Sequence, residues 1–236
     1  MGQYYFINIP SISTLEWHPF SISSSPEDLN TTHHIKNMGS DQWTGKLAQL
    51  ASLSSVDLAR TSLIIDGPYG IPLDLDSCKS VLFIAGGIGI TPIHSCIRHL
   101  YFAMRDGSKK YAHIERVRLV WPTRSKAIND IFDDSWSMIL SDNIVNNGTY
   151  SLTHSLTHSL THSLVYVGNI VFSVEKYVTS KGSRPDIANE IIGLARSCKN
   201  SDAALVFACG PKLLVDNCEK LTTQYNVPFK RETFLL

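Results

Sequence analysis

The stretch Val81-Leu82-Phe83-Ile84-Ala85-Gly86-Gly87-Ile88-Gly89-Ile90-Thr91-Pro92 decides the fold of this chain. It predicts a buried β-strand that leads through a glycine-rich turn into a helix. Glycines let backbone N–H groups approach a phosphate closely, and the N-terminus of a helix favours an anion. Thr91 is expected to cap that helix, and Pro92 suits its first turn. The stretch therefore predicts a nucleotide-binding turn.

Two regions of different pattern lie on either side of residue 76. The first is predicted to be β-rich, and its last strand candidate, 62–66, is expected to stop at the turn Asp66-Gly67-Pro68-Tyr69-Gly70. Beyond residue 77 strands alternate with helices, which favours a parallel sheet. The predicted strands of the chain are 3–9, 17–23, 62–66, 80–85, 115–121, 171–179 and 203–208, and the predicted helices are 91–104, 127–140, 185–197 and 212–225. The expected fold class is α+β followed by α/β, in two domains, 1–76 and 77–236.

Composition excludes several classes of function. The chain of 236 residues carries 21 basic and 21 acidic side chains, so its charge does not indicate a nucleic-acid partner. Its five cysteines are scattered and form no zinc-binding spacing, which favours a reduced environment and no metal site. No secretory signal and no apolar stretch of membrane-spanning length is visible, so this chain by itself is expected to be soluble.

A four-residue repeat interrupts the second region. Ser-Leu-Thr-His occurs three times from Ser151 to His162 and begins a fourth time at Ser163. We interpret 143–168 as a low-complexity insertion whose period suits neither a helix nor a strand. It is consistent with a translated four-nucleotide microsatellite, and even with translated intron. The alternative is a metal site, because His154, His158 and His162 would line up on one face of a helix.

Three further motifs accompany the glycine turn. One is Glu16-Trp17-His18-Pro19-Phe20-Ser21-Ile22-Ser23, and the second joins His33-His34-Ile35-Lys36 to Gln42-Trp43-Thr44-Gly45. The third is the ending Phe229-Lys230-Arg231-Glu232-Thr233-Phe234. With these motifs in this order, the chain resembles the C-terminal dehydrogenase region of NADPH oxidases, within the ferric-reductase and ferredoxin-reductase-like superfamily. The resemblance covers nearly the whole chain outside about 140–170.

The resemblance implies an antiparallel FAD-binding β-barrel in residues 1–76, incomplete at its N-terminus. A cation and a helix N-terminus suit the pyrophosphate of FAD, and Lys36 replaces the commoner arginine of the family. The FAD-binding residues it implies are His18, Pro19, Phe20, Ser21, Ile22, Ser23, His34, Lys36, Thr44 and Gly45. Because barrel strands precede this region in the family, we expect the chain alone to bind FAD weakly.

The resemblance also implies a parallel-sheet, Rossmann-like NADPH-binding domain in residues 77–236. Its glycine turn differs from the common dinucleotide motif, because Pro92 stands where a third glycine would be needed. Arg124 and Arg184 are expected to favour NADP over NAD, since a 2′-phosphate requires charge-assisted partners, although Ser183 is inserted before Arg184. The implied NADPH-binding residues are Gly86, Gly87, Gly89, Thr91, Pro92, Arg124, Arg184, Pro185, Gly210 and Pro211.

Two residues are expected at the reacting centre. By resemblance, Cys209 lies beside the reactive carbon of the nicotinamide and Phe234 covers the flavin, with Leu235 and Leu236 following it. The implied reaction is hydride transfer from NADPH to FAD. Electrons would then cross a membrane through haem, in a membrane domain outside this chain, to oxygen, giving superoxide. As part of its full-length parent, this chain would lie at the cytosolic face of that membrane. A ferric-chelate reductase and a non-catalytic fragment or mispredicted gene product stay open as alternatives.

Overall fold

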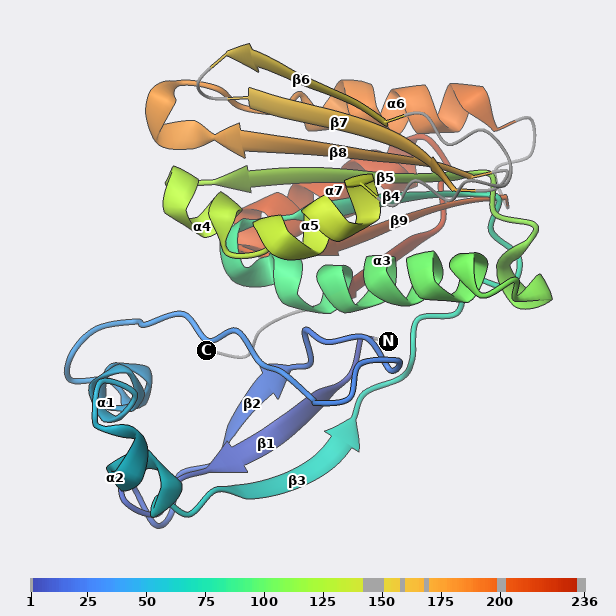
Figure 1. The fold of residues 1–236 in the computed structure, drawn as a ribbon. Coiled ribbons are helices and arrows are strands. Elements are labelled where there is room, and N and C mark those ends of the chain that lie inside the picture. Colours follow the sequence, from blue (N-terminus) through green and yellow to red (C-terminus); the bar gives the residue numbers. More distant parts are fainter. Residues whose placement is uncertain (1, 142–150, 158–159, 168–169, 199–202, 233–236) are drawn as a thin grey trace.

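The computed structural model describes residues 2–141, 151–157, 160–167, 170–198 and 203–232. They form two sheets, one in each half of the chain, with the long helix α3 (Ile90–Arg105) lying between the larger sheet and the smaller domain (Figure 1). The expected combination of an antiparallel sheet with a parallel sheet and helices is confirmed.

The smaller sheet is antiparallel, with strand order β2-β1-β3. Its strands are β1 (Tyr4–Asn8), β2 (His18–Ser21) and β3 (Ile64–Tyr69), and its helices are α1 (Trp43–Leu50) and α2 (Ser55–Ala59). A small core of Ile7, Ile9 and Trp43 joins β1 to α1, with Phe20 of β2 packed against it. Residues of β3 are exposed along its whole length.

Strand β3 differs from the sequence prediction, which ended it at Asp66. It continues to Tyr69, through Gly67 and Pro68, and its pairing with β1 shifts register between Tyr4 and Phe6. Gly67 has a φ of +132°, a backbone conformation that residues with a side chain rarely adopt. Gly67 and Pro68 lie in the shifted stretch between the Asp66 and Tyr69 pairs, where the missing N–H of proline is tolerated on an edge strand. The predicted turn is therefore an irregularity within a strand.

The larger sheet has the order β10-β9-β4-β5-β8-β7-β6, and its first five strands are parallel. Successive side chains of β4 enter two different cores: Val81 and Phe83 pack under α3, whereas Leu82 and Ile84 pack under the helices of the opposite face. Burial on both faces explains the unbroken apolar run of this strand. The strands are β4 (Ser80–Ala85), β5 (Arg116–Thr123), β6 (Ser151–Thr157), β7 (Leu160–Val167), β8 (Ile170–Val178), β9 (Ala204–Cys209) and β10 (Phe229–Glu232).

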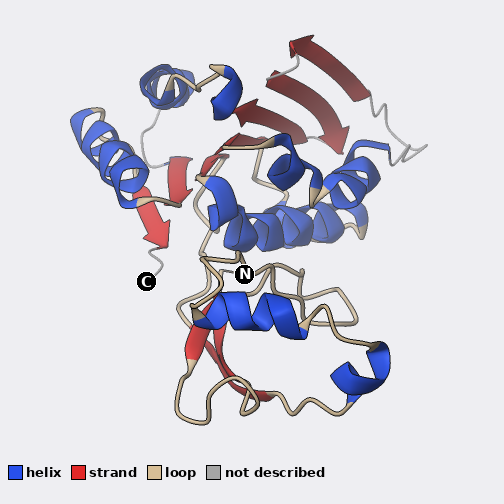
Figure 2. Ribbon diagram, turned by 90° about the vertical axis from the view of Figure 1, so that its left-hand side faces the viewer, coloured by secondary structure: helices blue, strands red, loops and turns tan. Residues whose placement is uncertain are grey.

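Helices cover both faces of this sheet (Figure 2). One face carries α3, α4 and α5, and the other carries α6 and α7. The remaining helix bounds are α4 (Lys126–Asp130), α5 (Asp133–Ser141), α6 (Ile187–Ser197) and α7 (Lys212–Gln224). The single helix predicted over 127–140 is thus two helices.

The repeat segment departs most from expectation. In the described residues it forms β6 and β7, an antiparallel extension of the parallel sheet beyond β8. The expectation that its period suits no strand is wrong, because a period of four is twice the two-residue period of a strand and keeps each residue type on one face. The backbone hydrogen bonds offered by β8 add to this. His158, one of the three repeat histidines, lies outside the described residues.

Candidate functional site

The two turns at the carboxyl ends of β4 and β9 touch each other. The backbone N–H of Gly86 donates to the carbonyl of Cys209 at 2.7 Å. A Cβ at Gly89 would lie 2.2 Å from the same carbonyl oxygen, and one at Gly210 would lie 2.7 Å from the Cα of Gly86. Only glycine allows backbones to approach so closely. The glycine turn and the Cys209-Gly210-Pro211 turn therefore form one unit, and Pro211 precedes α7.

The glycine turn leaves an anion-compatible helix end. Gly87, at φ +57°, has open space where a side chain would stand, and its carbonyl accepts a hydrogen bond from Trp121 Nε1 at 2.9 Å. Gly89 is the N-cap residue of α3 and provides no side-chain cap. An N-terminus without a side-chain cap, beside open space, suits the phosphates of a dinucleotide.

Thr91 does not cap this helix, which corrects the sequence prediction. Its hydroxyl donates to the carbonyl of Ile88 at 3.1 Å. The cause is a short 3₁₀ turn over Gly87–Gly89, which starts the helix at Ile90 and places Thr91 and Pro92 inside its first turn. Both are buried.

A carboxylate joins the two domains at this point. Ser21, the last residue of β2, donates its hydroxyl hydrogen to Glu232 Oε1 at 2.6 Å. Glu232 ends β10 and pairs in register with Cys209 of β9. The predicted flavin strand, the predicted nicotinamide cysteine and the glycine turn therefore meet around one glutamate, to which the sequence prediction gave no role beyond its place in the C-terminal motif.

Burial governs the protonation of this cluster. It raises the pKa of Glu232 to about 7, and the hydrogen bond from Ser21 only partly opposes it. The other carboxyl oxygen, Oε2, is buried and has no hydrogen-bond partner among the described residues. Burial also raises the pKa of the Cys209 thiol well above its ordinary value, with the charge of Glu232 adding to the effect. Cys209 is thus a neutral thiol near pH 7.

The flavin strand carries an aromatic group of residues. The ring of Trp43 lies 4.7 Å from that of His18 and 5.7 Å from that of Phe20, centroid to centroid. Pro19, which lies between His18 and Phe20 in the sequence, is half-buried. The indole nitrogen of Trp43 is buried without a partner in the described part of the chain. The half-buried rings of His18 and Phe20, packed against the buried ring of Trp43, suit contact with the ring system of a flavin.

Other predicted FAD residues lie further from this group. Ile22 donates its N–H to Gln3 at 2.9 Å and so continues the strand pairing. The hydroxyl of Ser23 bonds His34 Nδ1 at 2.7 Å, and the His34 ring packs 4.3 Å from that of Phe132. Both residues therefore contact the larger domain. Lys36 is exposed in the loop before α1.

Helix α1 begins at Trp43, as the motif predicted. The hydroxyl of Thr44 accepts a hydrogen bond from the backbone N–H of Met38 at 3.0 Å, which ties the loop to the helix. Gly45 lies against the same loop, since a Cβ there would stand 1.9 Å from the carbonyl oxygen of Gly39. Glycine is therefore required at position 45 by this close packing, in addition to any contact with a phosphate.

Gly45→Ala is therefore expected to destabilise the protein by about 1–3 kcal/mol, because a backbone atom cannot give way as a side chain can. Gly193→Ala in α6 is the matched control, since a Cβ there meets nothing within 4 Å. Alanine should stabilise that helix by up to about 1 kcal/mol. Urea unfolding midpoints measure both effects, and equal midpoints for the two variants would contradict the prediction.

The two predicted phosphate arginines lie at the same sheet edge as the glycine turn. Arg124 directly follows β5, and Arg184 lies between β8 and α6, beside Pro185. The adjacent strands β5 and β8 end in register, and Thr179 Oγ1 donates to the carbonyl of Thr123 at 2.9 Å. Both arginines are exposed, and neither forms an ion pair with another residue that the structure describes. Phe234 lies outside the described residues.

Two families account for the sequence. Residues 1–73 match the FAD-binding domain family, and residues 78–223 match the ferric reductase NAD-binding domain family. No helix in the described residues is long and apolar enough to cross a membrane.

Curated relatives extend along the chain. A superoxide-generating NADPH oxidase heavy chain of Dictyostelium discoideum is 30% identical over 244 aligned residues, covering 95% of this chain and 46% of the relative. NADPH oxidase 1 of Mus musculus is 27% identical, covering 99% of this chain and 41% of the relative. The chain thus spans less than half the length of these relatives.

Solved structures share the fold at low identity. A ferredoxin-NADP⁺ reductase mutant from Plasmodium falciparum, in complex with 2′P-AMP, has a TM-score of 0.64 at 14% identity, covering 99% of this chain and 82% of that one. Flavohemoglobin from Malassezia yamatoensis, with bound FAD and heme, has a TM-score of 0.60 at 14% identity, covering 99% of this chain and 51% of that one.

The fold and the family matches together define the dehydrogenase region of an FAD-dependent oxidoreductase, with an FAD-binding domain and an NAD(P)-binding domain. The chain belongs to the ferric reductase NAD-binding domain family, in the dehydrogenase region that NADPH oxidases and ferric reductases share.

Proposed function

We propose that this chain is the dehydrogenase part of an NADPH oxidase, which delivers electrons from NADPH through FAD and a haem-bearing membrane domain to oxygen, giving superoxide. The observation that carries the proposal is the meeting of Ser21, Glu232 and Cys209, where the flavin strand reaches the carboxyl ends of β9 and β10. The names of the relatives that cover most of the chain support oxygen as the acceptor.

The protein's own groups would bind and orient the two cofactors. When both are bound, NADPH supplies a hydride and FAD accepts it and releases the electrons singly. The open N-terminus of α3 at Gly87 and Gly89 would hold the phosphates of NADPH. His18 and Phe20, half-buried and packed against the buried ring of Trp43, would offer an aromatic surface to the flavin, with Ser21 at its polar edge. Glu232, protonated below about pH 7, can hold a proton next to Ser21.

The test is anaerobic flavin reduction. Purified protein loaded with FAD is mixed with NADPH in a stopped-flow instrument, and loss of the oxidised-flavin absorbance is followed. We expect rapid reduction by NADPH. If the FAD-loaded protein is not reduced, the proposed function is wrong and the alternative of a non-catalytic fragment is favoured.

A second candidate function is ferric-chelate reduction. A 43% identity with probable ferric reduction oxidase 1 of Arabidopsis thaliana supports it, although that match covers only 41% of this chain and 14% of the relative. Both candidates share the flavin reduction step and differ in the acceptor. Superoxide formation and reduction of a ferric chelate, measured side by side in membranes carrying the haem-linked protein, would separate them.

Arg124→Ala tests recognition of the 2′-phosphate. Arg124 is exposed at the end of β5 and has no ion-pair partner within the described residues, so its guanidinium is available to a phosphate. Removing it should weaken binding of 2′-phospho-AMP by about 10- to 100-fold, the range of a lost charge-assisted hydrogen bond. Binding of AMP should not change. Arg105→Ala, at the far end of α3, is the control, and calorimetry measures all three proteins. Equal weakening of both ligands would exclude this role.

A further inference from the structure

A second set of polar contacts joins the two domains, away from the cluster around Glu232. It runs along one face of α3, whose residues at positions i, i+1, i+4 and i+5 all reach the loop that follows the flavin strand. We call these contacts the α3 seam, and its members are His94, Ser95, Arg98 and His99 of α3 with Ser23, Ser24, Glu27 and Asp28 of the loop.

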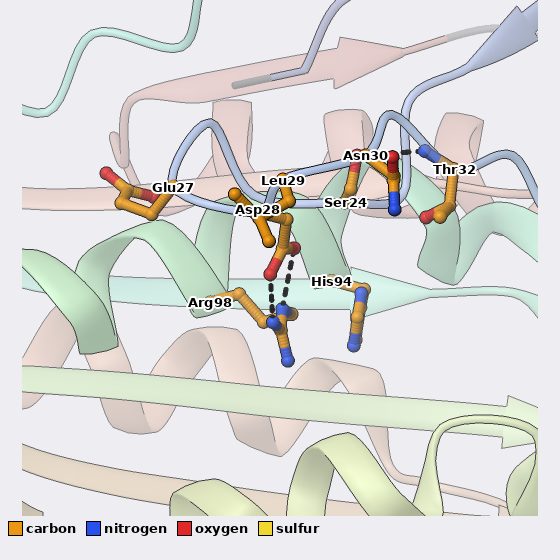
Figure 3. A pocket seen from close by; sticks show the side chains of 8 residues that line it. All are labelled: Ser24, Glu27, Asp28, Leu29, Asn30, Thr32, His94 and Arg98. Atoms are coloured by element: carbon orange, nitrogen blue, oxygen red, sulfur yellow. Dashed lines mark hydrogen bonds and ion pairs between the residues drawn. The ribbon is translucent and has the colours of Figure 1, made fainter.

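Each contact of the seam is a hydrogen bond or an ion pair. His94 Nδ1 lies 2.7 Å from the carbonyl oxygen of Ser23, and Ser95 donates to the carbonyl of Ser24 at 2.6 Å. Arg98 pairs with Asp28, with Nε 3.2 Å from Oδ2 and Nη2 on Oδ1 (Figure 3). His99 Nδ1 lies 2.6 Å from Glu27 Oε1.

Ser135 of α5 links Arg98 and His94 of the seam through one hydroxyl group, and we call the resulting chain of hydrogen bonds the circuit. Its hydroxyl oxygen lies 2.7 Å from Arg98 Nη1 and 2.9 Å from His94 Nε2. The directions follow from the chemistry of the groups. Arginine only donates, so Ser135 accepts from Arg98 and donates its own hydrogen to His94 Nε2. His94 Nδ1 faces a carbonyl and must therefore carry the proton that it donates to Ser23.

The circuit runs Asp28–Arg98–Ser135–His94–Ser23, and its exposure falls along it, from 25% for the side chain of Asp28 to 13% for that of Arg98. His94 is 5% exposed, and burial lowers its pKa to about 3, so the ring stays neutral. Its ring also packs 4.1 Å from that of Phe132. Because the hydrogen bonds along the circuit have definite directions, they hold the loop in one arrangement relative to α3.

Apolar packing contributes little to holding the loop on α3. A cavity of about 500 Å³ opens beside the seam, lined by loop residues together with His94 and Arg98 (Figure 3). Leu29, at the tip of the loop, is fully exposed. Hydrogen bonds are directional, whereas an apolar contact tolerates sliding. The placement of the loop on α3 is therefore decided by the seam.

The link between His94 and Ser23 is close in sequence to the predicted cofactor residues on both sides. Ser23 is itself a predicted FAD residue and follows Ser21 of the flavin strand by two positions, and His94 follows Thr91 of the NADPH turn by three. Displacing reacting groups by about 1 Å can slow a reaction about 100-fold. We propose that His94, Arg98 and Ser135 are positioning residues that set the distance between the flavin strand and the NADPH turn. The proposal rests on the hydride transfer proposed above.

Two substitutions break the circuit with little change of volume. Ser135→Ala removes its central link, and His94→Phe keeps a ring against Phe132 and removes both hydrogen bonds. His94→Asn is the conservative variant, because its amide can still donate to the carbonyl of Ser23. Ser197→Ala in α6 is the matched control, since its hydroxyl bonds only the carbonyl of Leu194 and the neighbouring Cys198, far from the circuit in sequence.

Two measurements are made on each variant. Hydrogen exchange of the protein without cofactors should accelerate about tenfold at residues 23–28 in Ser135→Ala and His94→Phe, because the loop loses its anchors. Flavin reduction by saturating NADPH should slow about 10- to 100-fold, with the affinities for FAD and NADP⁺ unchanged, as positioning requires. His94→Asn should recover most of the rate, and Ser197→Ala should match the parent protein in both measurements.

Three outcomes would overturn the proposal. Unchanged exchange at residues 23–28 would show that the circuit does not hold the loop. Faster hydrogen exchange at residues 23–28 with an unchanged rate of flavin reduction would show that the seam holds the loop but does not position the cofactors. If the parent protein fails to reduce flavin, the proposed function fails and the positioning role with it, while the exchange measurement still reports on the circuit.

Discussion

Glu232→Gln is expected to slow flavin reduction by NADPH about 100-fold while making the cofactor-free protein more stable at alkaline pH. Glutamine keeps an oxygen that can accept the hydrogen bond of Ser21, so the contact between β2 and β10 survives. It cannot gain or lose a proton, and the proton-holding role of Glu232 is lost.

The stability effect follows from the raised pKa of Glu232, about 7 in the folded protein against an ordinary value of 4.5. Between these values the folded protein binds more protons than the unfolded chain, so its stability falls as the pH rises. Glutamine removes this loss. The variant should therefore gain stability over the parent as the pH rises from 4.5, reaching about 3 kcal/mol above pH 7.

Urea unfolding at about pH 5 and about pH 8 measures the gain, and stopped-flow flavin reduction measures the rate. Glu219→Gln is the control, because Glu219 is half exposed and pairs with Arg231 on the same strand as Glu232, β10. It should change neither the rate nor the pH dependence of stability. A Glu232→Gln variant whose stability follows that of the parent across this range would show that the carboxyl group is not buried as described.

Gly89→Ala is expected to abolish tight NADPH binding and to cost about 3 kcal/mol of stability. The added Cβ would lie 2.2 Å from the carbonyl oxygen of Cys209 and 2.8 Å from the backbone N of Gly210, and backbone atoms there cannot move aside. The two turns must separate, which displaces both the helix end proposed to hold the phosphates of NADPH and Cys209, which is proposed to lie beside the nicotinamide.

Gly107→Ala, just after the other end of α3, separates this effect from general glycine strain. Gly107 has a φ of +75° and open space around it, so alanine there should cost about 1–2 kcal/mol and leave binding unchanged. Calorimetric titration with NADP⁺ and urea unfolding measure the two variants. Retention of parental affinity in Gly89→Ala would mean that the contact of the two turns is not required.

Several features of the fold could be predicted because they are local. The apolar run from Val81, the glycines after it and Pro92 predict a buried strand, a turn and a helix, and the structure confirms all three. Such elements depend on residues that are neighbours along the chain, so their pattern is visible in the sequence.

Predictions that required knowledge of distant neighbours were the weaker ones. The repeat forms strands in the described residues because β8 offers its edge, and β3 continues past Asp66 because β1 pairs with it. Thr91 does not cap α3, because the 3₁₀ turn over Gly87–Gly89 makes the helix begin at Ile90, one residue before it. In each case a tertiary or backbone contact outweighed the local preference.

By itself, the sequence determined the β-rich first region, the alternation of strands and helices in the second, the glycine turn and the family to which the chain belongs. Only the tertiary structure decided that Ser21 lies on Glu232, more than 200 residues away in the chain, and that α3 holds the loop after the flavin strand through His94 and Arg98. The physical reason is that burial and hydrogen-bond partners, which set the pKa of Glu232 and the protonation of His94, arise only when distant segments pack together.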